Sequence, residues 1–124
     1  MLKSIPSSLP IAESLKSSAI SLKDSGFEEV AWQRAQALQV IAQLQSSVWA
    51  ILGGDVVARE KGRFTSTHNS WSISPAHGET CDEFVPRSHR ESREYIERFP
   101  ESAESAIAYV LVFAPCEGRL LDLT

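Results

Sequence analysis

The sequence contains few cysteines and no long apolar run. Two cysteines, Cys81 and Cys116, are too few for the dense disulfide framework of a small secreted domain. Neither lies in a CxxC or Cys/His spacing typical of a zinc site. We therefore expect two free thiols in a reducing cytoplasm, with a single disulfide as the open alternative. Pro6 and several serines near the start predict neither a signal peptide nor a transmembrane segment.

The sequence also lacks an excess of basic residues. It has 12 Lys and Arg against 16 Asp and Glu, and a formal net charge of -4. Nucleic-acid binders and polybasic membrane anchors normally present a basic face, so neither kind of partner is expected. A cytoplasmic location is predicted. The 124 residues suit a single domain, with residues 1–8 and 117–124 as frayed tails.

Recognisable catalytic and cofactor motifs are missing as well. No Lys-Ser or Lys-Thr follows Gly53-Gly54, which excludes a phosphate-binding loop. The three histidines, His68, His77 and His89, are nine and twelve residues apart, whereas a helical metal site needs a spacing of four. We expect these histidines at the surface, and we predict no catalytic residue, cofactor or metal. An alternative is a thiol nucleophile that combines a cysteine with one of the histidines.

Apolar repeats at helical spacing predict three helices. The first is expected within residues 10–26, where Gly26 can end it in a left-handed conformation. The second is expected within residues 27–47, and Trp32 lies toward its glutamine-rich face. We expect another segment to cover this tryptophan. The third helix is expected to begin at Asp82 or Glu83.

Four strands are predicted between and after these helices. Three fall within residues 48–74, with a hairpin turn at residues 60–63, and the fourth is residues 106–114. The fourth run is nearly all apolar and is expected to be central. The order ααβββαβ contains no repeated βαβ unit. It predicts an α+β domain with a mostly antiparallel sheet of about four strands and three helices packed on it.

Two short segments stand out as candidates for a structural or functional role. Gly53, Gly54 and Asp55 follow an apolar strand, and we expect a structural turn there in which Asp55 accepts backbone N–H bonds. In the segment from His68 to Trp71, a tryptophan stands beside hydrogen-bonding side chains. Such a group is typical of a binding hot spot, and a tryptophan that closes the edge of a small core is equally ordinary.

The stretch from Ile51 to Val56 resembles a signature of the immunity protein 40 family of bacterial polymorphic toxin systems. Shorter segments at Trp32, at Asn69–Trp71 and along Tyr109–Val112 follow in the same order. The sequence departs from the pattern at Val57 and Ser72, where an aromatic residue is expected. The resemblance implies a protein that binds the C-terminal toxin domain of a cognate secreted effector. It would neutralise that toxin by direct, stoichiometric occlusion, without turnover or a cofactor.

We expect the toxin at a face that combines the hairpin with the start of the third helix. An aromatic anchor ringed by carboxylates would suit a basic toxin. The candidate residues are His68, Asn69, Trp71, Glu79, Asp82 and Glu83. A rival face is the glutamine-rich side of the second helix. Two other functions stay open, a small hydrolase or transferase that uses Cys81, a histidine and Asp55, and a general protein-interaction module. The sequence leaves the oligomeric state open.

Overall fold

The computed structural model describes residues 5–102 and 106–117 of the chain, and the predicted tail residues 1–4 and 118–124 lie outside this part. The described part has three α-helices, a short 3-10 helix and five strands, so the predicted α+β class is confirmed. The elements in chain order are α1 (Glu13–Ser18), β1 (Ile20–Ser21), η1 (Lys23–Ser25), β2 (Val30–Ala31), α2 (Arg34–Gln43), β3 (Trp49–Glu60), β4 (Arg63–Ser72), α3 (Cys81–Arg98) and β5 (Ala106–Pro115).

The main sheet has three antiparallel strands in the order β4-β3-β5, and β1 and β2 pair separately. The prediction of a central strand at residues 106–114 is therefore wrong, because β5 lies at an edge and β3 is central. The apolar run of β5 is explained by burial on both sides. Tyr109 and Leu111 belong to the core cluster that includes residues of α2 and α3, whereas Ala108 and Val110 pack with Leu22 in another cluster.

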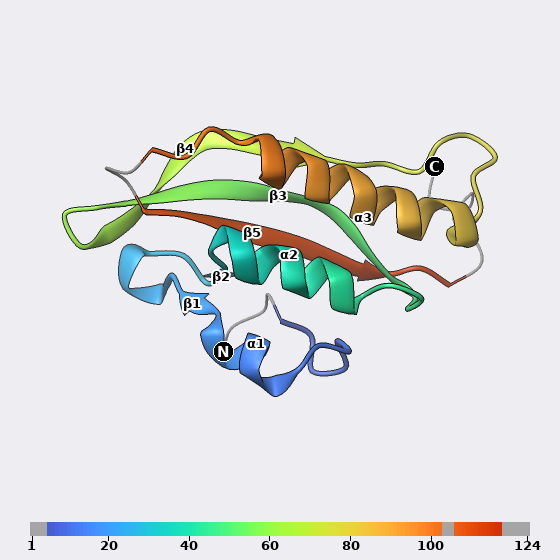
Figure 1. Ribbon diagram of the computed structural model, residues 1–124, viewed down its shortest axis with the longest axis horizontal. Helices are drawn as coiled ribbons and strands as arrows, with labels where there is room; N and C mark the ends of the chain where they lie inside the picture. The colour runs from blue at the N-terminus through green and yellow to red at the C-terminus, as the bar shows by residue number, and fades with distance from the viewer. Residues whose placement is uncertain (1–4, 103–105, 118–124) are drawn as a thin grey trace.

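The two long helices lie on the same side of the sheet (Figure 1). α3 packs along β3, α2 packs along β5, and the two helices also contact each other. Their apolar faces and the sheet enclose the main core. Its largest fully buried side chains include Trp32, Tyr109, Ile41, Leu44, Ile51, Ile96 and Leu111.

The segment before α2 differs from its prediction. α1 ends at Ser18, and β1, η1 and β2 occupy the residues that helical spacing had assigned to the ends of two helices. Gly26 does adopt a left-handed conformation, with φ of 91°, but it caps η1. Trp32 is fully buried, as expected, and its Nε1 donates a hydrogen bond to the Leu15 carbonyl at 2.8 Å. Short hydrogen-bonded turns thus replace the extra helical turns here.

The hairpin between β3 and β4 is confirmed, but β4 is one strand where two were predicted. Lys61 and Gly62 both have positive φ, 54° and 80°, as a tight two-residue turn requires. Farther along, the register between β3 and β4 shifts between Val56 and Val57. The extra residues of β4 at this bulge, Thr67 and His68, interrupt the pattern that had suggested two separate strands.

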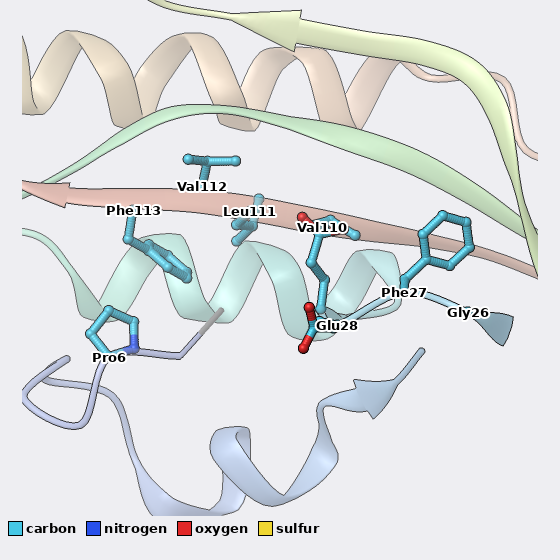
Figure 2. Close-up of a pocket in the computed structure, with 9 residues that line it drawn as sticks. Pro6, Gly26, Phe27, Glu28, Val110, Leu111, Val112 and Phe113 are labelled. Carbon is cyan, nitrogen blue, oxygen red and sulfur yellow. The ribbon is translucent and has the colours of Figure 1, made fainter. Parts of the chain in front are cut away.

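Only part of the outer edge of β5 is covered within the described residues. Trp32 and Tyr109 form an isolated antiparallel bridge, with hydrogen bonds of 2.9 Å and 2.7 Å between their backbones. Beyond this bridge a groove of about 500 Å³ opens between β5 and the N-terminal segments (Figure 2). Its lining residues are Pro6, Gly26, Phe27, Glu28, Glu29 and Val110–Phe113. We call it the edge groove.

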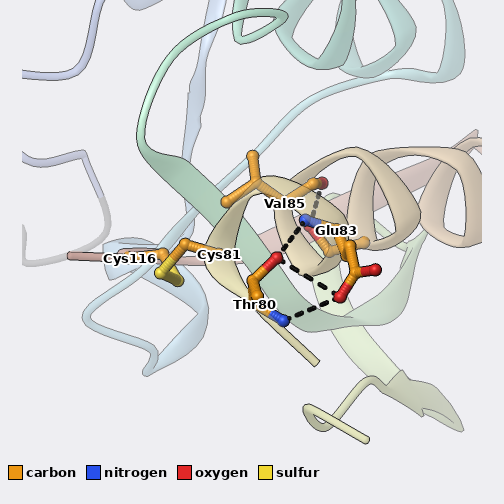
Figure 3. Close-up of a disulfide and its surroundings, with 6 residues drawn as sticks. Thr80, Cys81, Glu83, Val85 and Cys116 are labelled. Carbon is orange, nitrogen blue, oxygen red and sulfur yellow. Dashed lines mark hydrogen bonds between the residues drawn. A yellow bond between two sulfur atoms is a disulfide. The ribbon is translucent and has the colours of Figure 1, made fainter. Parts of the chain in front are cut away.

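A disulfide joins Cys81 to Cys116, so the expectation of two free thiols is wrong (Figure 3). Cys81 is the first residue of α3, and Cys116 follows β5. The two are 35 residues apart in sequence, and the short spacings typical of zinc and redox motifs give no signal at such a separation. The bond fixes the N-terminal end of α3 against the end of the sheet.

Candidate functional site

The six residues predicted to contact a partner lie at two separate places along α3. Asn69 and Trp71 of β4 lie beside the second half of the helix. Asn69 lines the same hollow as Glu94, and Trp71 stacks on Tyr95. The other group, Glu79, Asp82 and Glu83, lies at the N-terminal end of α3. Twelve residues of helix rise about 18 Å, which separates the two groups. The structure therefore does not form one continuous face from all six.

Glu79 is held by a contact within the chain. Arg87 donates to both of its carboxylate oxygens, at 2.7 Å and 2.8 Å, and also donates to the Ser74 carbonyl at 2.7 Å. The hydrogen bonds from Arg87 and from the Ala76 backbone lower the pKa of Glu79 from 4.5 to about 2. This ion pair fastens the loop before α3 to the helix, so Glu79 has a structural role.

Glu83 also has a structural role, as part of the cap of α3. Its backbone N–H donates to Thr80 Oγ1 at 3.3 Å, and its carboxylate accepts from the Thr80 N–H at 2.9 Å (Figure 3). This reciprocal capping box satisfies two backbone donors that the helix itself leaves unpaired. It lets the helix begin at Cys81, one residue before the earlier of the two predicted starts, and Pro86 lies inside the helix. Asp82 beside it is exposed.

Trp71 is a half-buried anchor between β4 and α3. Its ring stacks on Tyr95 with the centroids 4.6 Å apart and the planes 26° apart. Its Nε1 donates to Ser92 Oγ at 3.1 Å. Gly54 is the residue opposite on β3, and a Cβ there would clash with the indole ring. The glycine therefore leaves the space that the ring occupies.

The three residues predicted to form a turn lie inside β3 instead. Gly53, with φ of 145°, follows a bulge between Ile51 and Gly53 in the pairing with β5. Asp55 pairs with Ser70 on one side and Val110 on the other, and is exposed. The two glycines thus interrupt the regularity of a long strand without ending it.

The bulge on β4 carries the most unusual backbone of this surface. His68 has φ of 66°, a left-handed conformation that a residue other than glycine seldom adopts. Thr67 Oγ1 donates to the Val56 carbonyl at 2.9 Å, and Asn69 donates from its side chain to Thr67 Oγ1 at 3.1 Å. Bulges and strained residues concentrate at functional sites, so this segment is a candidate contact surface.

Asn69 and α3 enclose a hollow of about 490 Å³ next to the bulge. Polar, charged and aromatic side chains line it. We call His68 together with the residues of this hollow the bulge surface. The hollow is lined by Asn69, Glu91, Glu94, Tyr95, Arg98, Phe99 and Pro100.

His89 is buried, contrary to the expectation that all three histidines lie at the surface. Its Nε2–H donates to the Trp49 carbonyl at 2.7 Å, and burial lowers its pKa from 6.5. On the same helix, Ser88 Oγ accepts from the Ile51 N–H at 3.0 Å, next to the β3 bulge. Ser88 lies on the buried face of α3, and nothing in the sequence identifies its partner.

The disulfide also bears on the alternative of a thiol nucleophile. Cys81 is bonded to Cys116 and therefore has no thiolate for attack on a substrate. Asp55 lies in β3, whereas Cys81 begins α3. The structure thus gives no support to the proposed combination of Cys81, a histidine and Asp55.

Comparison with known proteins identifies the family of this scaffold. The family model described as Immunity protein 40 matches residues 21–113, from β1 through most of β5. The chain belongs to the immunity protein 40 family. No curated protein and no solved structure matches it. As an immunity protein 40 member it has a toxin as its implied partner.

The matched region explains the Ile51–Val56 resemblance in structural terms. Its residues supply the β3 bulge, the Ile51 N–H that binds Ser88 and the glycine beneath Trp71. In this immunity protein 40 chain, the signature therefore positions α3 and Trp71.

No helix in the described part is both long and apolar enough to cross a membrane.

Proposed function

We propose that this protein neutralises one cognate toxin by binding its toxic domain directly, in a stoichiometric complex and without turnover. Membership of the immunity protein 40 family is the observation that carries this proposal. The partner is the C-terminal toxin domain of a secreted effector. Binding would occlude the toxin's active site or the path of its substrate, so the immunity protein itself needs no catalytic group.

The bulge surface is the proposed contact for the body of the toxin. Its hollow can accept a projecting side chain, and Tyr95, which stacks on Trp71, gives it a rigid wall. Rigid aromatic support limits the entropy lost on binding. His68 and Asn69 are exposed beside the hollow. From the six residues predicted from sequence we retain these two and Trp71, because Glu79 and Glu83 are engaged within the chain and Asp82 is distant.

Growth rescue tests this proposal. Cells that express the toxin domain encoded beside this chain should grow when the chain is co-expressed, and the two should co-purify. The variants His68→Ala and Glu94→Ala alter the bulge surface and should each weaken the complex by more than ~1 kcal/mol. Asp82→Ala at the far end of α3 is the matched control and should leave affinity unchanged. Cell death without a complex would contradict the proposal.

A general interaction module is the remaining alternative. Such a protein would bind partners without protecting a cell, so rescue of growth separates the two functions. A cytoplasmic location would require that Cys81 and Cys116 are reduced in the cell. The disulfide favours an oxidising compartment, because cytosolic reductants normally keep thiols reduced.

A further inference from the structure

The outer edge of β5 exposes backbone hydrogen-bonding groups beyond its bridge with Trp32. Tyr109 uses both its N–H and its carbonyl in that bridge, so its backbone points away from β3. Cys116, seven residues later, donates its N–H to Val48 and so points toward the β3 side. Backbone groups alternate between the two sides of a strand. The backbone N–H and C=O groups of Leu111 and Phe113 therefore point away from β3, as those of Tyr109 do.

Within the described part of the chain, these outward groups of Leu111 and Phe113 have no hydrogen-bonding partner. They open into the edge groove, where β2 diverges from β5 after the single bridge. An unpaired strand edge is a template for another extended segment. The groove is about 500 Å³ in volume, which leaves room for such a segment.

The walls of the groove suit an extended segment with both apolar and basic side chains. Pro6 and Phe113 form one apolar end, and the ring of Phe27 lies toward the other (Figure 2). Val112 on the neighbouring sheet surface is 42% exposed. Glu28 and Glu29 line the groove together with residues of β5, and none of the lining residues is a lysine or an arginine. The opening is thus apolar with a negative rim.

We infer that the edge groove binds an extended, basic segment of the toxin domain, which adds to β5 as a further strand at Leu111 and Phe113. This inference rests on the proposed function, because it assigns part of the same partner. Backbone hydrogen bonds to the edge supply affinity, and side-chain contacts supply specificity, as in other strand-addition complexes. A lysine or arginine of the segment pairs with Glu28 or Glu29.

A second copy of this chain is the other occupant to consider. Two β5 edges could pair around Val112, but the four carboxylates of Glu28 and Glu29 from both copies would then gather at one interface. Like charges at an interface cost several kcal/mol when they are brought together. The negative rim therefore favours a basic partner over self-association.

Two measurements on the full chain with the toxin domain test the inference. The first is amide hydrogen exchange at Leu111 and Phe113, which should slow when the toxin domain binds. The second is the affinity of the double variant Glu28→Lys/Glu29→Lys, which should fall about tenfold or more at low salt. The matched control, Glu60→Lys/Glu97→Lys, makes the same charge change at exposed positions elsewhere and should alter affinity less than about twofold.

The outcomes separate this inference from the proposed function. Unchanged exchange at Leu111 and Phe113 in a stable complex, or equal losses in both double variants, would overturn the inference and leave neutralisation intact. Absence of any complex with the wild-type chain would overturn both. If the chain alone is dimeric and its Leu111 and Phe113 amides are already protected, the groove belongs to a second copy and the inference is wrong.

Discussion

Gly54 lies beneath the indole ring of Trp71, the residue opposite it on the neighbouring strand. A Cβ at Gly54 would clash with the ring on one side and with the Val110 carbonyl on the other. The ring lies between this glycine and Tyr95, which ties the sheet to α3. The pair explains why a glycine is placed in the middle of the central strand, where glycine is otherwise destabilising.

Substitution of this glycine should therefore be costly. Gly54→Ala should lower the free energy of unfolding by about 2–3 kcal/mol, because the ring and β5 must both shift. Gly26→Ala is the control, since a Cβ there meets no neighbouring atom and adds only the strain of a positive φ. Its cost should be about 1 kcal/mol. Urea unfolding measures both costs, and equal costs would show that the Trp71 ring is not tightly packed against Gly54.

The ion pair of Glu79 with Arg87 should make stability depend on pH in acid. The pKa of Glu79 is lowered in the folded state, so its contribution is present above pH 4.5 and is lost as the pH falls toward about 2. Glu79→Gln should lower the free energy of unfolding at neutral pH and should reduce its dependence on pH in this acid range. Glu97→Gln, at an exposed carboxylate on α3, is the control. Chemical unfolding at a series of pH values measures the effect, and parallel profiles for wild type and Glu79→Gln would contradict it.

His89 should affect a different range of pH. Burial lowers its pKa, so the unfolded chain takes up a proton near pH 6.5 while the folded chain resists it. Stability should decrease as the pH falls below 6.5. His89→Gln keeps a donor for the Trp49 carbonyl without this titration, and should reduce the pH dependence there. His77→Gln, at an exposed histidine, should retain the wild-type profile. Thermal unfolding between pH 5 and 8 distinguishes the two variants.

The disulfide should contribute substantially to stability. Closure of a loop of 35 residues restricts the unfolded chain by an amount equivalent to about 3–4 kcal/mol. The double variant Cys81→Ser/Cys116→Ser should lose roughly this amount in urea unfolding under oxidising conditions. Under reducing conditions, the variant and the wild type should become nearly equal. Rapid labelling of two thiols in the native, oxidised protein would show that the bond is absent.

Local patterns predicted the parts of this fold that depend on neighbouring residues. The hairpin at Lys61–Gly62 and the third helix follow from turn chemistry and helical spacing. The position of β5 did not follow, because a run buried on both faces looks the same at an edge and at the centre of a sheet. The Cys81–Cys116 pairing joins distant segments, and no local spacing signals it.

In the candidate site, too, features set by local residue types could be predicted, whereas features set by distant partners could not. The surface location of His68, and its grouping with Asn69 and Trp71 in one candidate contact segment, could be proposed from residue types. The roles of Glu79 and Glu83 could not, because each depends on a partner that only the folded loop places nearby. The edge groove was also missed, since open strand edges leave no residue pattern until the order of the strands is known.

Direct titration of the purified toxin domain with this chain tests the central claim most directly. The toxin's activity is assayed at increasing molar ratios of the chain, and the size of the complex is measured by light scattering. Neutralisation by occlusion predicts that activity falls linearly and disappears at a fixed stoichiometric ratio, with a stable complex of the same ratio. Full toxin activity at a several-fold excess of folded chain, or inactivation of many toxin molecules by one chain, would contradict the account.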